Sequence, residues 1–173
     1  MDITITTEQY KKAYNFANCS VKTNEDEYAK RNQKNVSKIT SDILTGKIAE
    51  YAVYNLLVSK GKACSEPDIA IYDRYSKSFD ADLYSDGKKV HVKAQTVESS
   101  KSFGSSWSFQ KQDILTFNPS SDDYICLCQV NGLEVKIMSF KEAKFYINKY
   151  KDPVLDKLKG IKKVLYLNDI KNT

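Results

Sequence analysis

The sequence predicts an α/β or α+β domain built around a central sheet, and three observations support this fold class. Apolar residues recur with a helical period up to about residue 61. Alternating polar and apolar residues follow, interrupted by Asp-Gly and Asn-Gly turn signals, and a further amphipathic helix comes after the strands. The 173 residues suit one domain, which we divide into an N-terminal helical region (1–40), a core (41–140) and a C-terminal helix with a basic tail (141–173).

The N-terminal part of the chain is expected to be helical. Residues 7–19 predict a short helix with Thr7 as its N-cap, and residues 24–38 predict a polar helix or an ordered arm. The strongest helical pattern begins at residue 40 or 41 and ends at Gly61. Its apolar positions have the spacing of one buried face: Ala49, Ala52, Val53, Leu56 and Leu57.

Period-two alternation then predicts strands. Residues 68–73 indicate a first strand, and residues 79–85 and 88–97 indicate two more. The dipeptide Asp86-Gly87 lies between the last two, and this dipeptide favours a tight hairpin turn. We therefore expect these two strands to pair in an antiparallel hairpin.

The rest of the chain predicts a second hairpin, a helix and a last strand. Residues 124–130 and 133–139 flank an Asn-Gly turn, and the first of them is almost wholly apolar, as a central strand is. Residues 139–151 predict an amphipathic helix, and residues 162–169 a final strand. Residues 107–115 fit neither period clearly.

The first hairpin gathers polar residues on one face. A two-residue turn places Asp82 opposite His91 and Asp80 opposite Lys93. Because side chains alternate across a strand, one face of the hairpin carries Asp80, Asp82, His91, Lys93 and Gln95. The other face carries Ala81, Leu83, Val90 and Val92 and is expected to meet the core. The polar face is open to two interpretations, the solvated side of a half-buried sheet or a site that binds a divalent cation.

Glu50 on the strong helix favours the second interpretation. It shares a line of the helix surface with Gly46, Val53 and Leu57, and therefore lies at the edge of the apolar face. A carboxylate in that position needs a partner. The partner is either a nearby lysine in a structural ion pair or a cation held together with the hairpin.

These residues resemble the PD-(D/E)XK nuclease superfamily. The matching positions are Glu50 in "GKIAEYAV", Asp82 in "DADL" and Lys93 in "HVK", and the resemblance covers roughly residues 41–130. It implies a restriction-endonuclease-like fold with a mixed sheet of four or five strands flanked by helices. It also implies Mg²⁺-dependent hydrolysis of phosphodiester bonds, with Asp82 as the central metal ligand, Glu50 as an accessory ligand and Lys93 positioning the attacking water.

One position departs from the superfamily pattern. His91 stands where an acidic residue is usual, and an imidazole suits Mn²⁺ or a transition metal better than Mg²⁺. We expect His91 to act as a metal ligand, Asp80 to supply the missing carboxylate and Gln95 to hold a water or a phosphate. The literal Pro-Asp dipeptide that ends at Asp68 ranks below Asp82, because Asp68 begins the strand before the hairpin.

The predicted activity is therefore that of a metal-dependent DNA endonuclease that uses Mg²⁺, with Mn²⁺ as an option. RNA stays open as a substrate, and a homodimer stays open as the assembly. One alternative is a weakened or inactive nucleic-acid-binding module on the same fold. Another is a binding domain of a different class whose hairpin is merely polar. The chain has no P-loop and no G-x-S-x-G elbow, and its single histidine would have to serve any serine or cysteine triad.

Three regions are candidates for nucleic-acid contacts: residues 101–113, which combine basic, amide, hydroxyl and aromatic side chains, the polar and basic residues 30–35, and the lysine-rich C-terminal region. The candidate residues are Lys101, Ser106, Trp107, Gln110, Lys111, Arg31 and Lys34. For Trp107 the alternative is that it anchors the segment in the core together with Phe109. A basic run is also often only a solvated face.

Charge, cysteines and the N-terminus indicate the type of partner and the compartment. The net charge of +5 permits a polyanionic partner without requiring one. The four cysteines form no C-x-x-C pair, and no disulfide framework is indicated. The first residues lack the features of a signal peptide, and no apolar run has the length of a membrane helix. We expect a cytoplasmic protein without a membrane partner.

Overall fold

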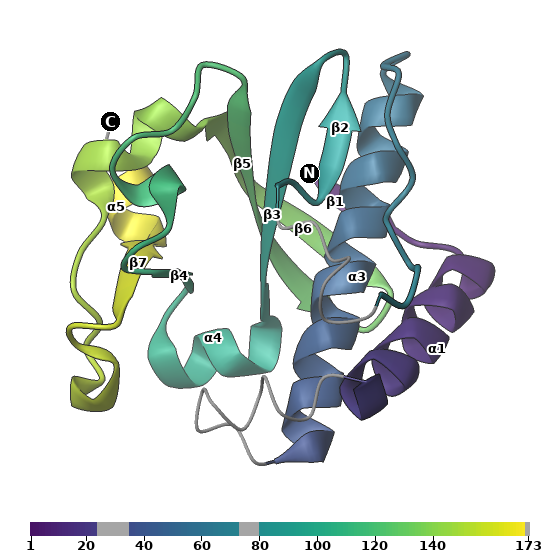
Figure 1. Cartoon of the computed structure of the whole chain (residues 1–173), viewed down its shortest axis with the longest axis horizontal. Coiled ribbons are helices and arrows are strands. Elements are labelled where there is room, and N and C mark those ends of the chain that lie inside the picture. Colours follow the sequence, from purple (N-terminus) through teal and green to yellow (C-terminus); the bar gives the residue numbers. More distant parts are fainter. Residues whose placement is uncertain (24–34, 73–79, 172–173) are drawn as a thin grey trace.

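The computed structural model describes residues 1–23, 35–72 and 80–171 and shows a mixed α/β architecture (Figure 1). Its centre is a five-stranded sheet with the order β1-β6-β5-β3-β2. The strands are β1 (Asp2–Thr4), β2 (Leu83–Ser85), β3 (Lys88–Thr96), β5 (Asp123–Asn131) and β6 (Glu134–Glu142). Strands β3 and β5 run parallel and the other neighbours antiparallel, so the predicted central mixed sheet is confirmed.

Two helices, α1 (Thr7–Thr23) and α3 (Val36–Ser59), lie against each other beside the sheet (Figure 1). Helix α1 is capped by Thr6 rather than Thr7, because the Thr6 hydroxyl accepts from the Gln9 amide and the Gln9 side chain accepts from the Thr6 amide. Helix α3 contains residue 40, so the boundary expected between the N-terminal region and the core falls inside this helix.

Helix α3 also begins earlier than residues 40 and 41. Asn35 caps it, since its side chain accepts from the Lys38 amide. The Thr40 hydroxyl instead donates to the Val36 carbonyl one turn back, as hydroxyls inside helices do. The predicted apolar face is confirmed, and its five residues are all buried.

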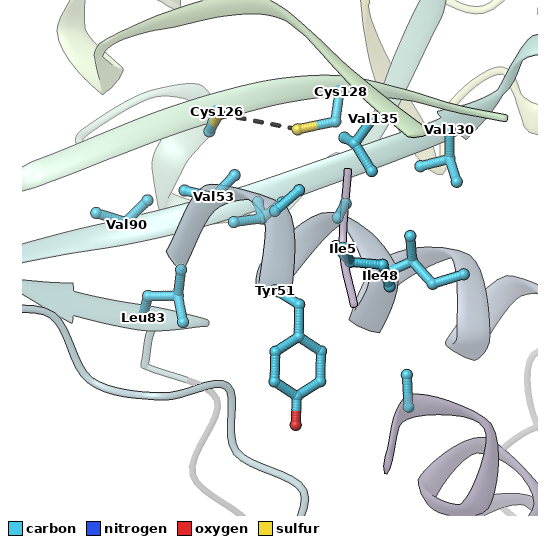
Figure 2. Close-up of a cluster of buried hydrophobic side chains, with 14 of the residues drawn as sticks. Ile5, Ile48, Tyr51, Val53, Leu83, Val90, Cys126, Cys128, Val130 and Val135 are labelled. Atoms are coloured by element: carbon cyan, nitrogen blue, oxygen red, sulfur yellow. Dashed lines mark hydrogen bonds between the residues drawn. The ribbon is translucent and has the colours of Figure 1, made fainter. Parts of the chain in front are cut away.

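The main core lies between α3 and the sheet. Figure 2 shows Val53 pointing toward the strands that carry Val90 and Cys126, while the ring of Tyr51 points away from the sheet. Leu83 of β2 packs into the same cluster. The apolar side of the hairpin therefore faces α3, as the alternation predicts. None of the helices in the described ranges is long and apolar enough to cross a membrane.

The opposite face of the sheet is covered by a second layer. A two-stranded sheet forms from β4 (Ser106–Gln110) and β7 (Lys162–Tyr166). Short helices accompany it: α4 (Val97–Phe103), η1 (Ile114–Thr116), η2 (Ala143–Lys149), η3 (Asp156–Leu158) and α5 (Leu167–Lys171). A second core joins this layer to β5 through Trp107, Phe109, Ile125, Leu127, Tyr146 and Leu165.

Several expected elements differ from the structure. Residues 68–72 form no strand, and residue 73 lies outside the described ranges, as does most of the expected helix 24–38. The segment 139–151 is not an α-helix, because β6 continues to Glu142 in pairing with β5 and only a 3₁₀-helix follows. The strand β1 was not predicted, since three residues are too few to show the alternation of polar and apolar side chains that indicates a strand.

Candidate functional site

The β2–β3 hairpin has the predicted register. Leu83 pairs with Val90 and Ser85 with Lys88, and the turn residues Asp86 and Gly87 both have positive φ. Positive φ at both turn positions is typical of a type I′ hairpin. The registered pairing ends at Leu83, although the Asp82 amide still donates to the Val90 carbonyl at 3.2 Å, so the two acidic residues before Leu83 lie outside strand β2.

Asp82 and Asp80 consequently lie in different surroundings from those predicted. The Asp82 carboxylate accepts a hydrogen bond from the Val92 amide at 2.7 Å, at the edge of β3. Asp80 lies at the surface, where it binds Lys89 at 2.6 Å and accepts from the Tyr84 hydroxyl. The predicted pairs Asp82–His91 and Asp80–Lys93 are therefore wrong, because β2 begins only at Leu83.

Asp80 is a solvated ion-pair partner, and Lys89 and Tyr84 hold its pKa below the usual range. The expectation that Asp80 supplies a carboxylate to a metal site stays a prediction, and the hydrogen bonds of its carboxylate that the structure shows are with Lys89 and Tyr84.

His91 meets a carboxylate that the sequence analysis missed. Its Nε2 lies 3.1 Å from an Asp123 oxygen, and the two side chains are 12% and 9% exposed. The other Asp123 oxygen accepts from the Ser120 amide at 2.7 Å. Asp123 begins β5, which pairs in parallel with β3, and a parallel neighbour so far along the chain leaves no local signal.

Lys93 and Gln95 share the face of His91, as predicted, but both are engaged with the second layer. The Lys93 ammonium lies 5.2 Å from the centre of the Phe109 ring. The Gln95 amide donates to the Gly104 carbonyl and accepts from the Ser106 amide, each at 3.0 Å. The Gln95 side chain therefore links β3 to the start of β4 through these two hydrogen bonds.

Glu50 faces the other side of the sheet, where α3 packs. It is 7% exposed and binds the Lys47 ammonium at 2.6 Å. Burial and the nearby Asp82 carboxylate raise the pKa of Glu50 to about 8, and Asp68 acts in the same direction while Lys47 opposes them. The structure shows the lysine partner, and a hairpin carboxylate lies near Glu50, while the cation shared with the hairpin stays a prediction.

A cavity of about 260 Å³ joins these groups. Its polar lining includes Glu50, Asp82, Asp68 and Lys47, and apolar residues of α1, α3 and the segment 70–72 complete it. Asp68, ranked below Asp82 from the sequence, thus lines the same cavity. Within residues 1–23, 35–72 and 80–171, no three His, Cys, Asp or Glu side chains are grouped closely enough to hold a metal ion.

The structure therefore divides the predicted catalytic residues and the predicted metal ligand His91 into two groups. Glu50 and Asp82 line one cavity on the side of α3. His91, Lys93 and Gln95 project from the opposite face of β3, toward the second layer. Asp82 stands between the groups, since it lines the cavity and also bonds the β3 backbone.

The predicted nucleic-acid contacts differ in their exposure. Trp107 is 2% exposed and its indole donates to the Cys128 carbonyl at 2.9 Å, so it anchors the core and is not available for stacking. The side chains of Lys101, Gln110 and Lys111 are exposed, and Ser106 is half-buried. Arg31 and Lys34 lie outside the described residues.

The His91–Asp123 contact predicts which ring nitrogen carries the proton. An ionised carboxylate only accepts hydrogen bonds, so the neutral imidazole is expected to be protonated on Nε2, leaving Nδ1 able to bind a proton or a metal. Because the chain has one histidine, ¹⁵N NMR shifts of the ring report this tautomer directly. Asp123→Ala is expected to give a mixture of tautomers, whereas Asp122→Ala, which removes only the exposed partner of Lys88, should not. Unchanged shifts in Asp123→Ala would contradict the assignment.

Comparison with known proteins identifies no relative of this chain. The superfamily resemblance therefore remains a prediction from Glu50, Asp82, Lys93 and the order of the elements around them. The structure provides the helix and the hairpin of that prediction, but not the strand expected between them in the described residues. No family model, no curated protein and no solved structure matches the chain.

Proposed function

We propose that this protein is a metal-dependent phosphodiester hydrolase that acts on DNA as an endonuclease. The observation that carries the proposal is the pair Glu50 and Asp82, which come from separate elements and line one cavity. Their mutual repulsion contributes to the raised pKa of Glu50. A buried carboxylate near a second one costs stability unless a proton or a cation neutralises it. Such an arrangement is typical of sites selected for function.

The two carboxylates suit a hard divalent cation. Mg²⁺ usually takes one or two protein carboxylates and fills its other positions with water and substrate phosphate, so a third protein ligand is not needed. Glu50 and Asp82 would hold the ion, and Asp68 lines the same cavity. A bound cation would polarise a phosphoryl oxygen and lower the pKa of a coordinated water.

The chain itself orients both carboxylates in advance. One Glu50 oxygen is fixed by Lys47 from the same helix, three residues away. One Asp82 oxygen is fixed by the Val92 amide of β3. Each carboxylate keeps a second oxygen for a ligand, and groups oriented in this way lose little entropy when a substrate binds. The cationic role proposed for Lys93 rests on the sequence resemblance, not on a contact with this cavity.

DNA is the proposed substrate because the charge of the protein favours a polyanion. The net charge is +5, and Lys101 and Lys111 are exposed on the chain that follows β3. Exposed basic side chains attract the phosphate backbone without reading its sequence. RNA has the same charge and is the alternative substrate.

A second function, binding without cleavage, is favoured by one observation. His91, predicted as a metal ligand, is held by Asp123, and Lys93, predicted as catalytic, lies against Phe109, so two of the predicted site residues already have partners. In a nucleic-acid-binding module with a weakened catalytic site, we expect former catalytic side chains to contact other parts of the protein in this way.

Cleavage of plasmid DNA with Mg²⁺ or Mn²⁺ tests the proposal. Asp82→Asn is expected to reduce the rate at least about 100-fold, because it removes a charge from the cation site while its amide oxygen still accepts from Val92. Asp42→Asn is the matched control, since Asp42 is an exposed residue of α3 paired with Lys38. Equal cleavage by Asp82→Asn and the wild type would overturn the proposed site. Retardation of DNA without cleavage of DNA or RNA by the wild type would favour the binding module.

A further inference from the structure

Lys47 occupies an unusual position for a lysine. It lies on α3 with a side chain only 13% exposed, although lysines are mostly solvated. Its ammonium is 2.6 Å from a Glu50 oxygen and 4.9 Å from the centre of the Phe16 ring of α1. Two different contacts, one ionic and one with an aromatic face, therefore fix this charge inside the molecule.

Lys47 also lines the cavity that holds Glu50 and Asp82. The other polar residues in its lining are Ser20, Asp68 and Tyr72, so among the residues that the structure describes Lys47 is the basic one of that lining. Lys93, the cationic residue expected from the sequence, lies instead against Phe109 on the opposite face of β3. The cavity thus has an ammonium of its own, which the sequence resemblance does not assign.

We infer that Lys47 binds a non-bridging oxygen of the substrate phosphate in this cavity. The inference rests on the proposed function, because it takes the substrate to be a phosphate ester that approaches Glu50 and Asp82. An ammonium group has three donors, and its contact with Glu50 uses one of them. The remaining donors are available to an anion that enters the cavity.

Charge explains why such a residue is needed. Asp68 and Asp82 line the cavity beside Glu50, and their ionised carboxylates would repel the negative charge of a phosphodiester. A fixed ammonium beside them offsets that repulsion on the path of the substrate, and it does so without the ordering cost that an exposed lysine has. The cavity is also smaller than the ~300–1,000 Å³ of sites that enclose a drug-sized ligand, so it suits one phosphate group of a longer chain.

Binding of a fluorescein-labelled DNA duplex, measured by anisotropy in EDTA so that no cleavage occurs, tests this role. Lys47→Met is expected to weaken binding about tenfold, and Lys47→Arg, which keeps the charge, to stay close to the wild type. The matched control is Lys38→Met, which removes an exposed, ion-paired lysine of the same helix. The salt dependence is the decisive readout, because loss of one phosphate contact lowers the slope of log K against log salt by about 0.9. A purely structural defect leaves that slope unchanged.

The outcomes separate this inference from the proposed function. Equal affinity and equal salt slope for Lys47→Met and Lys38→Met would overturn the role of Lys47, even if the wild type cleaves DNA. Weaker binding with a lower slope in Lys47→Met alone would support it, even if the wild type cleaves nothing. If Lys47→Met fails to fold, as thermal unfolding would show, Lys47→Gln replaces it, since its amide still donates to Glu50.

Discussion

Glu50→Gln is expected to abolish cation-dependent cleavage and, above neutral pH, to stabilise the fold. Burial and Asp82 raise the pKa of Glu50 from 4.5 to about 8, with Asp68 adding to the effect and Lys47 opposing it. Between these values the unfolded chain has released the proton while the folded chain retains it. The stability of the wild type therefore falls as pH rises through this window, by at most about 1.4 kcal/mol per pH unit. Glutamine has no proton to release and avoids this loss.

Urea unfolding at pH 5 and at pH 8.5 measures the effect. The stability difference in favour of Glu50→Gln should grow between the two pH values. Glu8→Gln serves as the control, because Glu8 is a largely exposed residue of α1. Parallel pH dependence in the wild type and Glu50→Gln would contradict the buried, proton-retaining state of Glu50. In the same samples, Mg²⁺ or Mn²⁺ should raise the melting temperature of the wild type and leave that of Glu50→Gln unchanged.

Trp107→Ala is expected to destabilise the protein by about 3–5 kcal/mol, the range for removing a large buried aromatic side chain. Trp107 belongs to the second core, and its indole N–H donates a hydrogen bond to the Cys128 carbonyl. The alanine variant would leave a cavity and would lose the hydrogen bond to the Cys128 carbonyl. Trp107→Phe keeps most of the volume and should lose less.

Chemical denaturation of the three proteins measures this loss. The wild-type chain has one tryptophan, so the tryptophan fluorescence of the wild type reports on this same site. A buried indole predicts blue-shifted emission that DNA does not quench. A stable Trp107→Ala variant with lost DNA binding would instead support the stacking role that the sequence left open.

Local patterns explain which parts of the fold could be predicted. The Asp86-Gly87 turn and the alternation around it specify the β2–β3 register, since both depend on neighbouring residues. The helical spacing likewise specifies the buried face of α3. The extent of β2 was not predictable in this way, because before Leu83 it is the side chain of Asp82, and not its backbone carbonyl, that accepts from the Val92 amide.

Contacts between distant segments explain the rest. Asp123 meets His91 only because β5 pairs in parallel with β3, and the long connection between them carries no register signal. Trp107 could be assigned to the core only once β4 was placed over the sheet. The pairing of Lys47 with Glu50 could have been predicted from the sequence, since the two residues are three positions apart on one helix. The burial of Lys47 could not, because it depends on contact with Phe16 of α1.

The sheet ends on both sides in strands of only three residues, β1 and β2. Strand β3 has nine residues, so β2 covers only part of its outer side. An uncovered strand edge is a template on which a second molecule can add its own strand, which is how many proteins begin to aggregate. The Asp82 carboxylate occupies the Val92 amide on this stretch and places a negative charge there. A residue proposed to hold a cation therefore also occupies a backbone donor that a second molecule would need in order to add a strand at this position.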